Sequence, residues 1–264
     1  MKITIYSVCW NEEVILPFFF QHYKKRFPSA SFVFYDNGSN DDSKNIITSN
    51  GGKIIDLDTN NKVRDDLVLQ IKNNCWKSSE NDWVIICDVD EFIDCDEKYL
   101  ISTDASIIKC EGYDMVGDTF ELSSLNRGTR NFWLDKCLLF DPRRVDEINF
   151  EPGCHNCNPI GDICYNDKRI ILKHYKYFNL SYVLKRFEIL AKRLSDENIN
   201  NGWGLHYQQS RNEIVDAYMF ILENSRAVPL PFYYHYLFRL LNNYKYYGII
   251  NNIIKIDRPF IHKK

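Results

Sequence analysis

The spacing of apolar residues alternates between two periods along the first 110 residues. Short, nearly continuous apolar runs predict strands, and the segments between them place apolar residues at the i, i+4, i+8 spacing of amphipathic helices. Strands that alternate with helices are typical of an open, mostly parallel sheet. The predicted strands cover residues 3–8, 31–35, 53–55 and 83–87, and the predicted helices cover 16–26, 40–49 and 63–77.

The pattern changes after residue 110. Further strands are predicted at 115–122, 137–140 and 169–172, separated by polar loops. Helices then dominate, because an apolar stripe that begins at Leu180 and a second that begins at Ile214 repeat with helical spacing. We therefore predict an α/β domain over residues 1–178 and a helical C-terminal region over 179–264. The aromatic segment 230–256 is expected to pack on the first domain, and an interfacial helix or a dimer contact are the alternatives.

Composition and charge exclude several classes of protein. The chain has 264 residues, of which 45% are hydrophobic and 26% charged, so it is not a disordered or low-complexity chain. A net charge of -3 argues against a nucleic-acid partner. No run of 18 apolar residues occurs, so membrane contact is expected to be peripheral at most. Nine cysteines, several within apolar runs, and a start without a signal peptide lead us to expect free thiols and a cytoplasmic location.

Polar side chains follow three of the predicted parallel strands. They are WNEE at 10–13, DNGS at 36–39 and DVD at 88–90. Ligands of open α/β sheets bind beyond the carboxyl ends of the strands, so these clusters predict one site. Two carboxylates held close together repel unless a cation compensates them. Because Mg²⁺ binds one or two carboxylates together with substrate phosphates, Asp88 and Asp90 predict a metal that bridges the protein to a diphosphate.

These motifs resemble those of the GT-A-fold glycosyltransferases, in particular the group similar to glycosyltransferase family 2. The resemblance rests on WNEE at 10–13, DNGSND at 36–41, RD at 64–65 and DWVIICDVDEF at 82–92. Weaker matches are GCH at 153–155 and KHY at 173–175. The specific part of the resemblance lies in the first half of the chain.

The resemblance implies a Rossmann-like GT-A fold, with a mostly parallel mixed sheet flanked by helices. It further implies transfer of a sugar from a nucleotide-diphosphate sugar to a glycan or other hydroxyl acceptor, with Mn²⁺ or Mg²⁺ as cofactor. Inversion at the sugar carbon is the expected stereochemical outcome. Asp88 and Asp90 would lie near the ribose and the diphosphate. The residues expected to bind the nucleotide sugar are Asn11, Glu13, Asp36, Asn37, Arg64, Asp65 and Asp88.

Two histidines are candidates for further metal ligands. His174 follows a late apolar strand, where some GT-A enzymes carry a third ligand, and His155 lies in a Gly-bearing turn that suits a metal, phosphate or acceptor role. Each histidine also has an ordinary structural interpretation, as a core or capping residue. Cys154 and Cys157, with Cys164, suggest zinc only weakly, because structural zinc sites usually contain two such pairs.

An inverting transferase needs a general base for the acceptor hydroxyl. We expect Glu151 in this role, with Asp118 second, although the paired-acid signature of the family is absent. Two alternatives stay open: a catalytically inactive glycan- or nucleotide-binding protein, and a phosphatase of the haloacid dehalogenase type. Phe92 and the position of the motif after a fourth strand disfavour the phosphatase. A homo-oligomer is compatible with the sequence.

Overall fold

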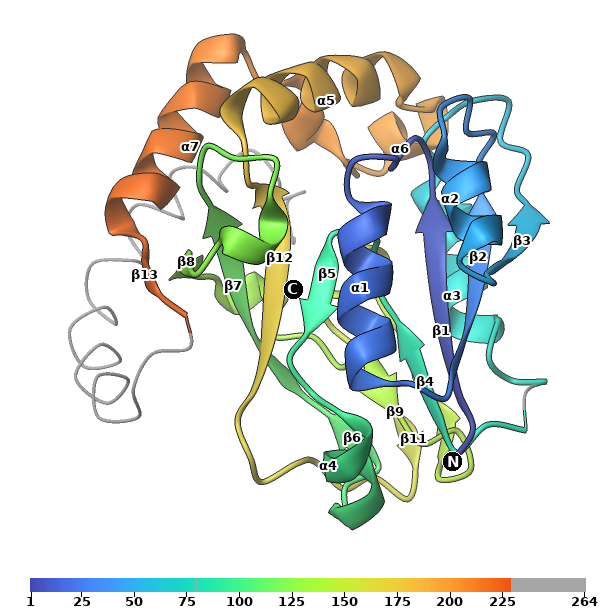
Figure 1. Ribbon diagram of the computed structural model, residues 1–264. Coiled ribbons are helices and arrows are strands. Elements are labelled where there is room, and N and C mark those ends of the chain that lie inside the picture. Colours follow the sequence, from blue (N-terminus) through green and yellow to red (C-terminus); the bar gives the residue numbers. More distant parts are fainter. Residues whose placement is uncertain (79, 229–264) are drawn as a thin grey trace, which may run out of the picture.

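The computed structural model describes residues 1–78 and 80–228 and has a mixed α/β fold (Figure 1). Its larger sheet has the strand order β3-β2-β1-β4-β9-β6. The strands β1 to β4 are parallel, whereas β9 runs antiparallel to both β4 and β6. The strands of this sheet are β1 (Ile3–Cys9), β2 (Ala30–Asp36), β3 (Lys53–Asp56), β4 (Trp83–Ile86), β6 (Ile107–Ile108) and β9 (Leu139–Phe140).

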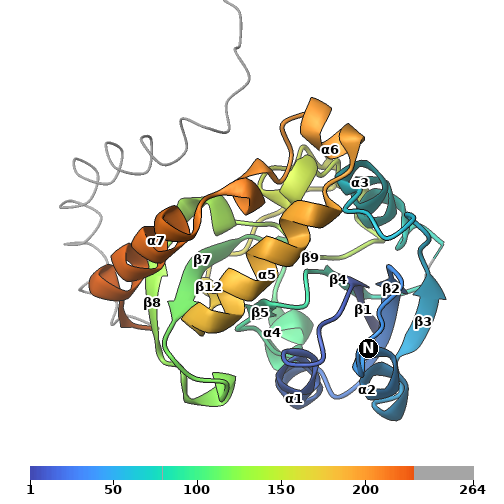
Figure 2. The same ribbon diagram turned by 90° about the horizontal axis from the view of Figure 1, so that it is seen from above.

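Helices cover both faces of the larger sheet. α1 (Leu16–Arg26) and α2 (Ser43–Ser49) lie on one face, and α3 (Asp65–Asn74) lies on the opposite face (Figure 2). Four side chains of α1 are buried against the sheet, and β4 is buried at every position. Burial on both faces explains why β4 reads as a continuous apolar run rather than an alternating one.

A second sheet begins where the chain leaves β4. Its order is β13-β8-β7-β12-β5, in which only β7 and β12 pair in parallel. The link between β4 and β5 therefore crosses from one sheet to the other and carries Asp88 and Asp90. The strands are β5 (Glu91–Ile93), β7 (Cys110–Val116), β8 (Arg127–Arg130), β12 (Ile170–Tyr177) and β13 (Arg226–Ala227), and a separate hairpin pairs β10 (Val145–Glu147) with β11 (Ile160–Gly161).

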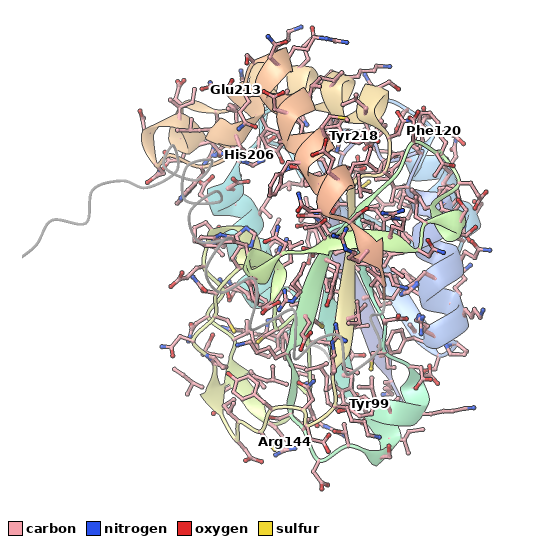
Figure 3. All side chains as sticks on the ribbon, turned by 90° about the vertical axis from the view of Figure 1, so that its left-hand side faces the viewer. Tyr99, Phe120, Arg144, His206, Glu213 and Tyr218 are labelled. Carbon is pink, nitrogen blue, oxygen red and sulfur yellow. The ribbon has the colours of Figure 1, made fainter. Side chains whose placement is uncertain are left out.

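The later helices lie over the ends of these strands. α5 crosses above the sheets, with α7 to one side of it and α6 beside α3 (Figure 2). Glu213 and Tyr218 of α7 lie at the end of the molecule opposite to Tyr99 and Arg144 (Figure 3). One hydrophobic core unites both sheets, and a small separate cluster joins α5 and α7 through Val183, Phe187 and Ile214. The remaining helices are α4 (Glu97–Ser102), α5 (Leu180–Arg193), α6 (Asp196–Asn200), α7 (Arg211–Asn224) and the short 3-10 turns η1 (Leu122–Ser124), η2 (Phe132–Leu134), η3 (Pro152–Cys154) and η4 (Leu205–Gln208).

The structure confirms the predicted fold class and corrects several boundaries. The strand expected at 115–122 is β7, which spans Cys110–Val116. The polar residues of β7 obscured its strand pattern in the sequence. Gly112 is required in this strand because a Cβ at that position would lie 2.0 Å from Leu134 Cβ. The strand expected at 169–172 is β12, which continues to Tyr177, so His174 lies inside a strand. The strand expected at 137–140 is limited to β9, and the helices expected at 40–49 and 63–77 are the shorter α2 and α3.

Two further expectations concern the chain as a whole. None of the helices in residues 1–78 and 80–228 combines the length and apolar character needed to span a bilayer. All nine cysteines are free thiols. The division at residue 178 stays a prediction, and segment 230–256 lies outside the described residues.

Candidate active site

Asp88 lies at the carboxyl end of β4, where a buried lysine compensates its charge. Lys72 of α3 donates from Nζ to Asp88 Oδ1 at 2.6 Å, and the side chain of Lys72 is only 5% exposed. The backbone N–H of Asp88 donates to Glu91 Oε2 at 2.9 Å, and Lys136 pairs with Glu91 Oε1 at 2.6 Å. Burial alone would raise the pKa of Asp88, but these two ammonium groups outweigh it and hold that pKa below its usual range.

Asp90 faces His174 across the junction of the two sheets. Its Oδ2 lies 3.3 Å from His174 Nε2, and Asp114 Oδ1 lies 2.7 Å from His174 Nδ1. Two backbone links fix the same geometry, because Tyr175 N donates to Asp90 O at 2.8 Å and His174 pairs with Glu91 in the β12–β5 ladder. Burial lowers the pKa of His174, but the two carboxylates overcome this effect and raise it to about 10.

The four predicted metal ligands do not form a ready-made cluster. In the part of the chain that the structure describes, no group of three or more His, Cys, Asp or Glu side chains is arranged to hold a metal ion. Asp90 Oδ2 and His174 Nε2 nevertheless lie 3.3 Å apart, and a divalent cation bound between them would replace the proton that the two carboxylates keep on the imidazole. Asp114 on the other ring nitrogen is the arrangement that orients a metal-binding imidazole. The donor set therefore fits a divalent cation that takes its remaining ligands from substrate phosphates and water.

His155 forms a hydrogen bond with Trp133 rather than with Asp90 or His174, although the charges of His174 and Asp88 act on its pKa. Its Nδ1 is 2.7 Å from the backbone oxygen of Trp133, which can only accept, so the Nδ1 proton is donated there and Nε2 carries the lone pair. Burial, together with the Lys136 cation, lowers the pKa of His155 to about 4, and the ring is neutral at pH 7. A neutral imidazole with a free nitrogen suits a role in accepting a proton or a hydrogen bond.

The two candidate bases occupy different places. Glu151 is exposed and caps the start of η3, with its Oε2 accepting a hydrogen bond from Asn156 Nδ2 at 3.0 Å. Asp118 follows β7 and accepts from Asn179 Nδ2 at 2.8 Å. No contact joins either acid to Asp88 or Asp90 within the described residues. Their assignment as bases stays a prediction.

The loops that follow β1 and β2 are bonded to each other. Asn11, with φ of 50°, exchanges two hydrogen bonds of 2.8 Å with Asn40, and its N–H donates to Ser39 Oγ at 2.9 Å. Glu13 accepts from Asp42 N at 3.0 Å. The side chains of Asn11 and Glu13, both predicted to bind the nucleotide sugar, therefore hold the loops in place.

Asp36 and Asn37 lie side by side but differ in their hydrogen bonding. Asn37 Nδ2 donates to Lys62 O at 3.0 Å, and its Oδ1 accepts from Thr59 at 2.6 Å. Asp36 accepts from Ser39 N and Lys44 through Oδ2, whereas its buried Oδ1 has no partner. Both residues line a cavity of about 180 Å³, together with Gly38, Asp56, Leu57, Asp58 and Asn61. Oδ1 of Asp36 is thus a buried acceptor without a donor among the described residues, on a side chain at the wall of this cavity.

The Arg64–Asp65 pair starts α3 and is connected to the C-terminal helices. Arg64 forms a two-pronged ion pair with Asp66, at 2.8 and 2.6 Å. Asp65 exchanges two hydrogen bonds with the Asn198 amide: its N–H donates to Asn198 Oδ1 at 3.0 Å, and Asn198 Nδ2 donates to Asp65 Oδ2 at 2.9 Å. Asn198 belongs to α6, so a helix from the second predicted region holds this loop of the first.

Arg186 of α5 is the main link between α5 and the β1 loop. It donates at 3.0 Å to the backbone oxygens of Asn11 and Trp10, and it pairs with Glu12. Burial, only partly offset by Arg186, raises the pKa of Glu12 to about 7. The helical region therefore forms one wall of the candidate site.

Sequence reasoning missed four residues of the site: Lys72, Asp114, Glu12 and Arg186. For Glu12 a signal existed, since it lies within the WNEE motif. No such signal existed for the other three, because the partners of Lys72, Asp114 and Arg186 are 16, 60 and 174 residues away in the sequence. A larger cavity, of about 730 Å³, lies between α5, η4 and α7, and no predicted site residue lines it.

Comparisons with known proteins bear on the fold. No family model matches the sequence, and no curated protein matches it. Among solved structures, the chain is similar to TarS from S. aureus, at 13% identity and a TM-score of 0.44, over 83% of this chain and 43% of TarS. The chain thus spans less than half the length of that protein.

Two further solved structures are similar to the chain. The 1–349 segment of S. aureus TarS in complex with UDP-GlcNAc matches at 14% identity and a TM-score of 0.43, over 83% of this chain and 72% of the other. Glucosyl-3-phosphoglycerate synthase from Mycobacterium tuberculosis, in complex with Mn²⁺, UDP and glucosyl-3-phosphoglycerate, matches at 13% identity and a TM-score of 0.31, over 42% and 44%.

Proposed function

We propose that the protein is a glycosyltransferase that uses a nucleotide-diphosphate sugar, requires Mn²⁺ or Mg²⁺, and inverts the configuration at the sugar carbon. The observation that supports this most is the group at the junction of the sheets, where Asp90, two residues after Asp88, lies 3.3 Å from a histidine held by Asp114. Glycan or other hydroxyl groups are the proposed acceptors.

The residues of the junction would each make a different contact that helps to bind the leaving group. When bound, a divalent cation acts as a Lewis acid and stabilises the negative charge that develops on the leaving diphosphate. Asp90 and His174 would bind it, and Asp114 fixes the orientation of the imidazole. Lys72 occupies one oxygen of Asp88 and leaves the other, on a side chain that is 41% exposed, for the ribose or the cation.

The nucleotide is proposed to lie at the ends of β1 and β2, where the unpaired oxygen of Asp36 can accept a hydrogen bond. For the general base we propose Glu151, whose exposed carboxylate can reach an incoming acceptor, and Asp118 as the second choice. Inversion requires only one such base, acting on the acceptor hydroxyl.

The test measures release of UDP and GDP from UDP- and GDP-sugars, and of CMP from CMP-sugars, with and without Mn²⁺. Asp90→Asn should lower turnover by about 10²–10³-fold, because several kcal/mol of charge stabilisation are lost. Asp88→Asn should have an effect of similar direction. Asp146→Asn, at an exposed acid of β10, is the matched control and should retain wild-type turnover. Full wild-type activity in EDTA would contradict the metal requirement.

A further inference from the structure

The segment that links β8 to β9 contacts the junction of the two sheets at both of its ends. At its start, Asn131 Nδ2 donates to Asp114 Oδ2 at 2.7 Å. The other oxygen of Asp114 lies 2.7 Å from His174 Nδ1. Towards its end, Lys136 forms a buried ion pair with Glu91 at 2.6 Å. The short turn η2, which lies between these two contacts, is therefore held in place beside the proposed metal site.

Two aromatic residues of η2 nevertheless face solvent. Phe132 is 54% exposed and Trp133 is 46% exposed, and they are the only consecutive pair among the large hydrophobic residues exposed in 1–78 and 80–228. Phe132 has a structural partner, because the guanidinium carbon of Arg130 lies 4.3 Å from the centre of its ring. Exposed apolar surface of this kind often marks a site for a ligand, and Trp133 supplies the larger ring.

Trp133 is bonded to the turn that carries the proposed base. Its backbone oxygen accepts from His155 Nδ1 at 2.7 Å, and the two rings meet edge to face with 5.8 Å between their centres. Glu151 and His155 flank the same short turn, η3. The charges of His174 and Asp88 act on the pKa of His155, which shows that the junction is near this ring. The indole thus borders the region where the proposed function requires an acceptor.

A flat, half-exposed indole suits a sugar ring. The C–H groups on one face of a pyranose carry a small positive charge, whereas the face of an aromatic ring is negative. Stacking also removes these C–H groups from water and leaves the hydroxyls at the rim free for polar partners. An anionic acceptor would need a free cation, but Arg130 and Lys136 of this segment already pair with Asp135 and Glu91 at 2.6 Å. The surroundings of Trp133 therefore favour an uncharged sugar.

We propose that Trp133 binds an uncharged sugar unit of the acceptor, which stacks on the indole while its reacting hydroxyl points toward Glu151. This inference rests on the proposed function, and it narrows the acceptor from any hydroxyl compound to a glycan. Trp133 supplies a flat contact surface and no acid or base. Its loss should therefore weaken acceptor binding and leave the rate at saturating acceptor unchanged.

The experiment measures transfer from the best of the UDP-, GDP- and CMP-sugars in the presence of Mn²⁺. The acceptors are neutral mono-, di- and trisaccharides, with glycerol 3-phosphate as an anionic hydroxyl compound, and hydrolysis of the donor without acceptor is measured in parallel. We expect the wild type to transfer to a neutral saccharide. Trp133→Ala should raise the KM for that saccharide about tenfold, equivalent to about 1.4 kcal/mol, with kcat and the KM for the donor unchanged.

Three further variants separate stacking from other effects. Trp133→Leu keeps an apolar side chain without a flat ring and should behave like Trp133→Ala. Trp133→Phe keeps a smaller ring and should lie between Trp133→Ala and the wild type. Tyr165→Ala is the matched control, because it removes an aromatic side chain of similar exposure, 48%, next to β6. It should leave the KM for the acceptor unchanged.

Several outcomes would overturn the inference. An unchanged acceptor KM in Trp133→Ala would do so and leave the proposed function intact, as would a change confined to kcat. A wild type that consumes its donor but transfers only to glycerol 3-phosphate or water would have the same meaning. A wild type that consumes none of the donors would overturn the proposed function, and this inference with it. If circular dichroism shows that Trp133→Ala does not fold, Trp133→Phe carries the test, and an unchanged acceptor KM there would contradict the inference.

Discussion

The two ends of the candidate site are built from different kinds of interaction. After β1 and β2, amide and hydroxyl side chains bond one loop to the other, as Asn11 does with Asn40 and Asn37 does with Thr59. At the junction of β4 and β12, charged groups pair with one or both partners buried, as Lys72 does with Asp88 and Lys136 does with Glu91. Polar residues at strand ends therefore have two separate tasks. Amides bond the loops to each other, whereas two buried lysines and a histidine pair with carboxylates at the junction.

Replacement of the buried Lys72 is expected to give the largest effect at the junction. Lys72→Met keeps much of the volume but leaves Asp88 without its partner. We expect turnover to fall by about 100-fold, equivalent to about 2.7 kcal/mol of transition-state stabilisation. Breaking a fully buried ion pair lowers the free energy of unfolding by roughly 3–5 kcal/mol. The loss in Lys72→Met should be smaller, because Asp88 retains contact with water.

The measurement for Lys72→Met combines steady-state kinetics with urea unfolding. Lys77→Met, at an exposed lysine paired with Glu147, is the control and should change neither quantity appreciably. If Lys72→Met lowered stability but left turnover unchanged, the lysine would have no part in holding Asp88 for the reaction.

The two histidines of the candidate site differ in how they are held. His174 is fixed by β12 and two carboxylates, whereas His155 has a single hydrogen bond in a short turn. His174→Ala should raise the Mn²⁺ concentration for half-maximal activity by about tenfold or more, in line with the loss of a metal-binding side chain. His155→Ala should instead lower turnover or acceptor use. Metal titrations at saturating donor check both, and the opposite pattern would show that the roles are exchanged.

The smallest effects are expected at the loops. Asp36→Ala should weaken nucleotide binding by several-fold in a calorimetric titration, since it removes an acceptor worth about 1 kcal/mol. Asn37→Ala removes bonds within the protein instead and should lower the free energy of unfolding by about 1 kcal/mol. Equal nucleotide affinity in Asp36→Ala and the wild type would place the nucleotide elsewhere.

The first half of the fold could be predicted because its apolar runs are continuous. Strands β1 and β4 differ from their expected bounds by a single residue each. The second half was harder, since β7 contains Asp114 and Gly112, the former bonded to His174 and the latter packed against Leu134. Residues selected for a site or for close packing break the strand pattern that their neighbours would otherwise show.

The candidate site was predictable only where its residues share a motif. Asp88 and Asp90 follow one strand, and their common position could be inferred from the sequence alone. Their compensating groups, Lys72 and His174, come from α3 and β12, and a local pattern carries no information on such pairings. The role of the C-terminal helices was equally hidden, because Arg186 and Asn198 look like ordinary helix-surface residues in the sequence.

The attachment of α5 and α6 has a practical consequence for dividing the chain. Arg186 bonds the β1 loop, Asn198 bonds the start of α3, and Val63 pairs with Leu194 in an isolated bridge. A fragment that stops at residue 178 would lose all three attachments and expose the apolar faces beneath them. Grafting another transferase's C-terminal helices onto residues 1–178 would therefore require that these anchoring residues be transplanted as well.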